Sequence, residues 1–91
     1  MRSRRANIGI EVCFNSFYET LERNLKYALT EEKIYADIFI NNIDKAGETL
    51  RDELFGMHIV DAFSWKEYVI LREKVYRIVK EYTKAIKNIE R

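Results

Sequence analysis

Cysteine is nearly missing from this sequence, since Cys13 is the only one among 91 residues. An internal disulfide is therefore excluded, and no potential metal ligand stands at a useful spacing around this residue. A lone thiol is typical of a reducing compartment. We expect a cytoplasmic protein that holds neither a metal ion nor a cofactor.

Long apolar runs and a charge imbalance are missing too. The apolar run at residues 8–14 is only seven residues long and contains Glu11, which excludes a membrane-spanning helix there. With 16 basic and 15 acidic residues, the formal net charge is +1. This balance argues against a protein whose main task is to coat nucleic acid or an anionic membrane.

Glutamine and proline do not occur, whereas isoleucine, glutamate, lysine and arginine are abundant. Few thermolabile amides together with many charges make the composition thermophile-like. Six asparagines run against this trend. A thermophilic origin is therefore kept as a hypothesis.

The residues that are present belong to a folded chain. Hydrophobic residues make up 47% of it and aromatic residues 13%, which is enough for a small core. No repeat, low-complexity tract or Gly/Ser linker divides it, so we expect one domain over residues 7–91, preceded by a basic flexible tail over residues 1–6. A compact monomer of this size is marginally stable, which favours an oligomer.

Residues 8–14, IGIEVCF, fit two structures. Apolar residues alternate with Gly9, Glu11 and Cys13, as in a strand, but the same residues also fit the spacing of a helix. Ser16 and Glu19 form a capping-box pattern, which favours a helix that begins near residue 16 and ends near residue 29. Strand and helix stay equally open for residues 8–14.

A second helix is predicted from residue 31 to about residue 55, with Thr30 as its N-cap. Its apolar stripe includes Phe39, Ile43, Leu50 and Leu54. Gly47 interrupts the helix at a cost of about 1 kcal/mol relative to alanine, so we expect a neighbouring backbone to approach closely there. Gly56 is the expected C-terminal stop.

The third helix has the clearest pattern. Ser64 and Glu67 form another capping box at its start. Its apolar positions repeat at spacings of three and four, as in a heptad seam of core or interface residues: Tyr68, Leu71, Val75, Ile78, Tyr82, Ala85 and Ile89. A second stripe runs beside this seam and implies burial against more than one helix: Val69, Tyr76, Val79 and Ile86.

The sequence therefore predicts an all-α fold, a three-helix antiparallel bundle with two long helices and a shorter first helix. At 1.5 Å per residue, a helix over residues 16–29 would be about 21 Å long, against about 37–39 Å for each of the others. It would leave nearly half of the groove between the long helices uncovered. A second copy of the chain is the simplest cover, so we expect a homodimer.

The only histidine stands in LRDELFGMH, residues 50–58. Arg51, Asp52 and, after a five-residue spacer, His58 resemble the R-polar-x(4–6)-H motif of the HEPN superfamily, small helical domains that often act as metal-independent ribonucleases. The resemblance implies a motif at a dimer interface and cleavage of RNA by its 2′-hydroxyl. His58 would carry protons and Arg51 would stabilise phosphate charge. In the alternative interpretation, Arg51 and Asp52 lie on a solvated helix face and His58 lies in a loop.

Two further patterns have weaker implications. Asp37, Asp44, Glu48 and Asp52 form an acidic row, but a helical di-metal site would need Glu-x-x-His pairs, so the row is predicted to be a solvated stripe. A strand at residues 8–14 followed by two helices resembles, in outline, a ribbon-helix-helix DNA binder. Its phosphate contacts would come from Arg2, Arg4 and Arg5, which equally fit a solubilising tail.

We expect a non-enzymatic interaction module that acts as a homo-oligomer and binds a protein partner not identified by the sequence. The alternative is a HEPN-like ribonuclease, or an inactive relative of one, with RNA as its partner. A DNA-binding protein with a basic N-terminal arm is the third hypothesis.

Overall fold

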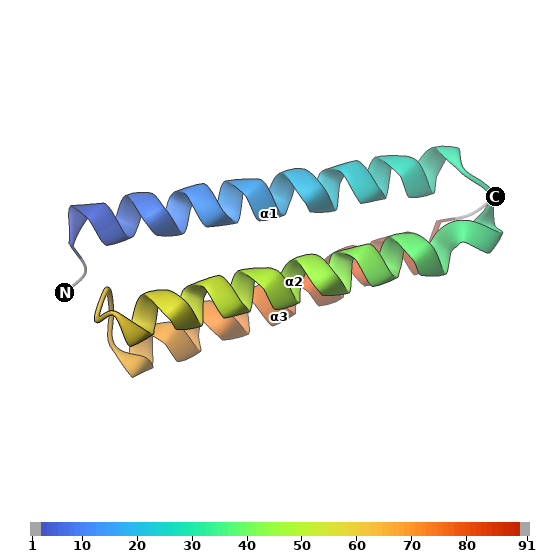
Figure 1. The fold of residues 1–91 in the computed structure, drawn as a ribbon. Coiled ribbons are helices and arrows are strands. Elements are labelled where there is room, and N and C mark those ends of the chain that lie inside the picture. Colours follow the sequence, from blue (N-terminus) through green and yellow to red (C-terminus); the bar gives the residue numbers. More distant parts are fainter. Residues whose placement is uncertain (1–2, 90–91) are drawn as a thin grey trace.

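The computed structural model describes residues 3–89 as three helices joined by short turns. Helix α1 spans Arg4–Thr30, α2 spans Ala36–Ile59, and α3 spans Trp65–Lys87; a short 3-10 helix, η1 (Lys33–Tyr35), precedes α2. Successive helices run antiparallel, and α1 and α3 both pack along α2 (Figure 1). The described residues contain no strand, so the predicted all-α three-helix bundle is confirmed. Within the same residues, no helix has the length and apolarity needed to cross a membrane.

Helix α1 is the longest of the three, where we predicted the shortest. Ser3 caps it, because its hydroxyl oxygen accepts a hydrogen bond from the Ala6 amide at 3.1 Å. The helix then continues through residues 8–14, so the helical alternative for that segment is correct. The predicted start at Ser16 is wrong: within a continuous helix the amides near Ser16 are bonded to carbonyls one turn earlier and need no cap.

The start of α1 also corrects two other predictions. The tail predicted over residues 1–6 is helical from Arg4 onward, and Ala6 is buried. Because residues 8–14 form no strand, the outline of a ribbon-helix-helix protein is wrong. Met1 and Arg2 lie outside the described residues.

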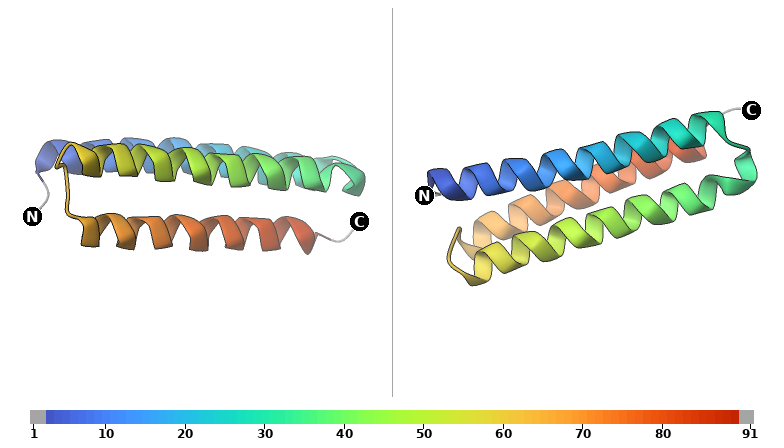
Figure 2. Two further views of the ribbon diagram at one scale, coloured as in Figure 1. Left: turned by 60° about the horizontal axis from the view of Figure 1, so that its bottom comes forward. Right: turned by 45° about the horizontal axis from the view of Figure 1, so that its top comes forward.

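The length of α1 removes the argument from which we predicted a homodimer. Its 27 residues correspond to about 40 Å of helix. The views in Figure 2 show α1 running the full length of the other two helices. The groove between α2 and α3 is therefore not left half uncovered, and a dimer needs other support.

Helix α2 does not stop at Gly56, as we predicted. It continues to Ile59, and the chain turns at Asp61, whose φ of 62° lies in the left-handed region. Aspartate tolerates this conformation better than most residues because its short side chain can bond locally to the backbone. Ser64 then caps α3, accepting a hydrogen bond from the Glu67 amide at 3.2 Å.

The core lies along the line where the three helices meet. Of the residues predicted to face inward, these are buried: Ile43, Leu50, Leu54, Tyr68, Leu71, Val75 and Ile78. Phe39, Tyr82 and Ile89 are partly buried and pack against them. Ala85 is exposed, and Ile86 is buried in its place. A straight helix with 3.6 residues per turn drifts away from a strict heptad, so the buried line moves from Tyr82 to Ile86.

Gly47 marks a close approach of α3 to α2. A Cβ atom at this position would lie 2.6 Å from Cγ2 of Val79, a distance that real Cβ contacts do not reach. The close approach predicted here is present, although the neighbour is a side chain and not the backbone. Gly56 is different, since a Cβ atom there would meet no atom within 4 Å.

The two glycines of α2 allow a matched test. We expect Gly47→Ala to lower the free energy of unfolding by about 1–3 kcal/mol, because the new methyl group overpacks a β-branched neighbour that cannot easily rotate away. We expect Gly56→Ala to raise it by about 0.5–1 kcal/mol, because alanine is the better helix former in open space. Urea denaturation followed by circular dichroism measures both. Equal effects of the two changes would show that α2 and α3 are not in contact at Gly47.

Candidate functional site

One long side of the bundle, where α2 and α3 meet, gathers cationic and aromatic side chains. We call it the α2–α3 face and define it by Arg51, Phe55, His58, Trp65, Tyr68, Arg72 and Tyr76. Three of its rings are exposed to solvent despite their size: Phe55 to 42%, Trp65 to 53% and Tyr76 to 48%. The face therefore presents a large apolar area bordered by positive charge.

Arg51 and His58 both lie on this face. They are separated by two helical turns, or about 10 Å along the axis of α2. The Arg51 guanidinium carbon lies 4.3 Å from the centre of the Tyr76 ring, a cation–π contact between the two helices. His58 belongs to α2, so the alternative interpretation of a loop histidine is wrong; Arg51 is half-buried and Asp52 is exposed on the same helix.

The His58 ring is held in one orientation. Its Nδ1 atom lies 3.0 Å from the carbonyl oxygen of Phe63. A carbonyl only accepts hydrogen bonds, so Nδ1 carries the proton and Nε2 is left as the basic nitrogen of the neutral ring. The ring stacks on Tyr68 at 6.1 Å and meets Trp65 edge-on at 5.5 Å. His58 is thus part of an aromatic cluster.

Arg72 extends the pattern along α3. Its guanidinium carbon lies 5.4 Å from the Tyr68 ring centre and 5.9 Å from that of Trp65. Its Nε atom is also 3.9 Å from a carboxylate oxygen of Glu73. Each arginine of the face is therefore placed against an aromatic ring that belongs to α3.

Sequence reasoning missed Phe55, Trp65, Arg72 and Tyr76 as members of a surface. Their spacing carried the signal: positions 65, 72 and 76 of α3 are separated by two turns and then one, and so share a side of the helix. Which side of α2 they would meet follows only from the packing. The buried stripes alone do not tell how the helices are rotated against each other.

The third residue of the HEPN-like motif lies elsewhere. Asp52 is exposed and stands one position after Arg51, about 100° farther around α2. The other members of the acidic row are exposed as well: Asp37, Asp44 and Glu48. Within residues 3–89, no group of three or more His, Cys, Asp or Glu side chains is arranged to hold a metal ion.

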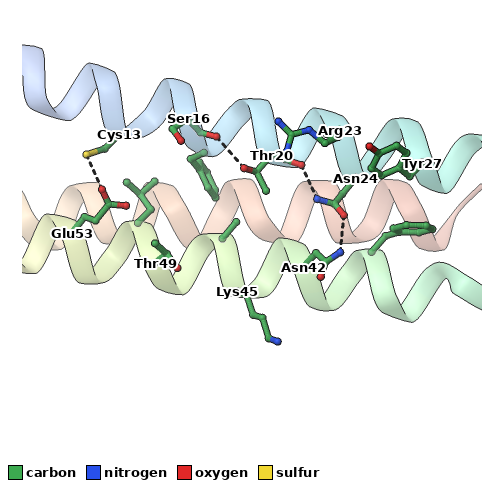
Figure 3. Close-up of a pocket in the computed structure, with 14 residues that line it drawn as sticks. Cys13, Ser16, Thr20, Arg23, Asn24, Tyr27, Asn42, Lys45, Thr49 and Glu53 are labelled. Atoms are coloured by element: carbon green, nitrogen blue, oxygen red, sulfur yellow. Dashed lines mark hydrogen bonds between the residues drawn. The ribbon is translucent and has the colours of Figure 1, made fainter.

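A hollow of the bundle lies on a different side, between α1 and α2 and away from α3 (Figure 3). This α1–α2 groove has a volume of about 590 Å³. Its lining is Cys13, Ser16, Phe17, Thr20, Arg23, Asn24, Tyr27, Phe39, Asn42, Lys45, Ala46, Thr49, Leu50 and Glu53. The lining combines aromatic and aliphatic residues with polar and charged ones.

Two contacts across the groove fix how α1 lies against α2. The buried Asn24 donates to the Thr20 carbonyl oxygen at 2.8 Å and accepts from the Asn42 amide at 3.0 Å. Near the other end, the Cys13 thiol donates to a Glu53 carboxylate oxygen at 3.3 Å. Burial raises the pKa of Cys13 to about 11, and the hydrogen bond and negative charge of Glu53 add to the effect.

The raised pKa of Cys13 predicts a slow thiol. Only the thiolate reacts with iodoacetamide, and its fraction at pH 8 falls about tenfold for each unit by which the pKa rises. With a pKa of about 11, we expect Cys13 to react many times more slowly in the folded protein than in the urea-unfolded chain. Glu53→Gln should speed the reaction of the folded protein, and Asp52→Asn, which removes a neighbouring exposed carboxylate, should not. Equal rates for the two variants would rule out the contact with Glu53.

The chain was compared with family models, with curated proteins and with solved structures, and none of these matches it. Its function therefore has to be argued from the chemistry of the α2–α3 face and the α1–α2 groove.

Proposed function

We propose that this protein is a non-enzymatic helical interaction module, that it works as a homodimer, and that its α2–α3 face binds a protein partner. The observation that carries the proposal is the row of half-exposed rings and arginines along this face. Tryptophan, tyrosine and arginine are the residues that contribute most to binding energy in protein interfaces. Arg51 is held against Tyr76 here, and Trp65, about 16 Å farther along α3, is held against His58, Tyr68 and Arg72.

The side chains of this face are already held in place, which lowers the entropic cost of binding a partner. Arg51 rests on Tyr76, and Arg72 lies against Tyr68 and Trp65. Side chains that are held in place before binding lose less rotamer freedom when a partner arrives. Glu73 beside Arg72 keeps the face from being uniformly cationic, which favours a protein surface over the phosphate backbone of a nucleic acid.

The shape of a single chain supports the homodimer. Its accessible surface is 6489 Å², about 900 Å² more than the roughly 5600 Å² expected for a compact monomer of this mass. Its radius of gyration is 14.7 Å, whereas a compact chain of this length would have about 12 Å. The excess is close to the roughly 800 Å² that each partner buries in a standard interface.

The partner-binding proposal is tested on the α2–α3 face itself. Protein captured from cells of the source by the tagged wild type is purified and titrated against variants. We expect Trp65→Ala and Tyr76→Ala each to weaken its binding at least tenfold, because each removes a large exposed ring of the face. Ile70→Ala removes an equally exposed apolar side chain from another side of α3 and should bind as the wild type does. A captured protein that binds all three variants with wild-type affinity would contradict the proposal.

A second candidate is the HEPN-like ribonuclease, and one observation favours it. Arg51 and His58 share the α2–α3 face, and the bond to Phe63 leaves Nε2 of His58 as the basic nitrogen. A histidine held in this way suits proton transfer, and an arginine on the same face suits stabilisation of phosphate charge. Two copies joined through this face would bring both pairs into one cleft.

The ribonuclease candidate predicts cleavage of single-stranded RNA in the presence of EDTA, with products that end in a 2′,3′-cyclic phosphate. His58→Ala and Arg51→Ala should each abolish cleavage, because the proton carrier or the phosphate contact is lost. Arg77→Ala, which changes an exposed arginine on another side of α3, should leave it unchanged. Cleavage that persists in both His58→Ala and Arg51→Ala would point to a contaminating nuclease and would remove this candidate.

A further inference from the structure

We propose that the α1–α2 groove is the homodimer surface, and that a second copy of this chain occupies it in antiparallel orientation about a two-fold axis. The inference rests on the proposed homodimer and names the surface that forms it. It leaves the α2–α3 face free for the partner. The order of the groove residues along the bundle decides which of them would meet in such a dimer.

The contacts across the groove give this order. Cys13 meets Glu53 and Asn24 meets Asn42, so residues of α1 and α2 whose numbers add up to 66 stand at the same level. Arg23 therefore lies about ten residues, or roughly 15 Å, along the axis from the level of Glu53. The positive charge stands in one half of the groove and the negative charge in the other.

Opposite charges in the two halves make the groove self-complementary. A two-fold axis perpendicular to the helices, halfway between Arg23 and Glu53, would place Arg23 of each copy at the level of Glu53 of the other. Such an isologous contact repeats each pair twice. Lys45 lines the same half as Arg23 and extends from α2 away from α1 (Figure 3), where it adds to the positive side.

Short hydroxyl side chains of the groove stand where the two copies would come closest. The level of the axis falls beside Ser16, Thr20 and Thr49, which line the groove. Short side chains let helix surfaces approach closely and leave hydroxyl groups to bond across the contact. Bulky residues there would instead hold the two copies apart.

Exposed apolar residues at the two ends of the groove would also meet each other in this dimer. Ile8 and Val12 stand eight and four residues before Ser16, on a continuation of its side of α1, and are 53% and 61% exposed. Ile38 lines an apolar hollow with Tyr27 at the other end of the groove. The same axis would place Ile8 of one copy at the level of Ile38 of the other, so an apolar end meets an apolar end.

The wild-type protein and two variants test the surface by sedimentation equilibrium. We expect the wild type to have about twice the 10.9 kDa chain mass at 100 µM, a concentration of the order used for weak dimers. Thr49→Arg should raise the dimer dissociation constant at least tenfold, because it places two like charges at the axis. Asn41→Arg makes the same change at an exposed position of α2 outside the groove and should have no effect. Circular dichroism checks that each variant stays helical.

A charge exchange tests the orientation of the two copies. Arg23→Glu and Glu53→Arg should each weaken the dimer, since each sets like charges against one another across the contact. The variant with both changes should recover most of the wild-type affinity. A double variant weaker than either single one would overturn the antiparallel arrangement.

Trp65, the only tryptophan, separates this surface from the α2–α3 face. Dissociation of a dimer held through the α1–α2 groove should leave its emission maximum and its quenching by acrylamide unchanged on dilution. A red shift of the Trp65 emission on dilution, together with no effect of Thr49→Arg on dimerisation, would show that the homodimer forms through a surface other than the groove. A wild type that remains monomeric at 100 µM would overturn the homodimer itself.

Discussion

Gly47 has no side chain, and this absence lets α2 and α3 lie close together. The geometry of the α2–α3 face depends on that short distance. Val79 occupies the space that a Cβ atom would take, so the two helices meet more closely than larger residues would allow. One turn later, Arg51 lies flat against Tyr76 across the same interface. A wider separation would leave both side chains without their partner and would open the aromatic cluster around His58. The α2–α3 face depends on this one close contact.

Most of the fold could be predicted from the sequence, because helix periodicity and caps are local signals. The cap at Ser64 and the buried line from Tyr68 to Ile78 are of this kind. The start of α1 could not be predicted in the same way. Residues 8–14 carry both periodicities, and the decision for helix comes from packing: Gly9 lies beside Met57, and Phe14 is buried in the core. Tertiary contacts decided a local ambiguity.

The candidate site was visible in the sequence only as a motif. Arg51 and His58 were recognised because their spacing in the sequence resembles a known motif, although the second helix was expected to end before His58. Their aromatic neighbours Trp65 and Tyr76 come from α3, and only the rotation of α3 against α2 brings them to the same face. The α1–α2 groove was not foreseen at all, since it depends on which small side chains of α1 and α2 meet. A surface formed by two helices can be predicted only when their packing is known, whereas a stripe on one helix can be predicted from its sequence alone.

The hydrogen bond that the exposed Asn42 donates to the buried Asn24 has a consequence for the choice among alternative structures. Apolar stripes on long helices interlock almost equally well after a slide of one turn, so they specify alignment poorly. In such a slid state the side-chain oxygen of Asn24 would lose its donor while the bond to Thr20 within α1 remained, and an unsatisfied buried acceptor costs about 1–3 kcal/mol. That penalty corresponds to a preference of roughly five- to more than a hundredfold for the native alignment. Two asparagines thus allow a small bundle of repetitive helices to have one structure instead of several.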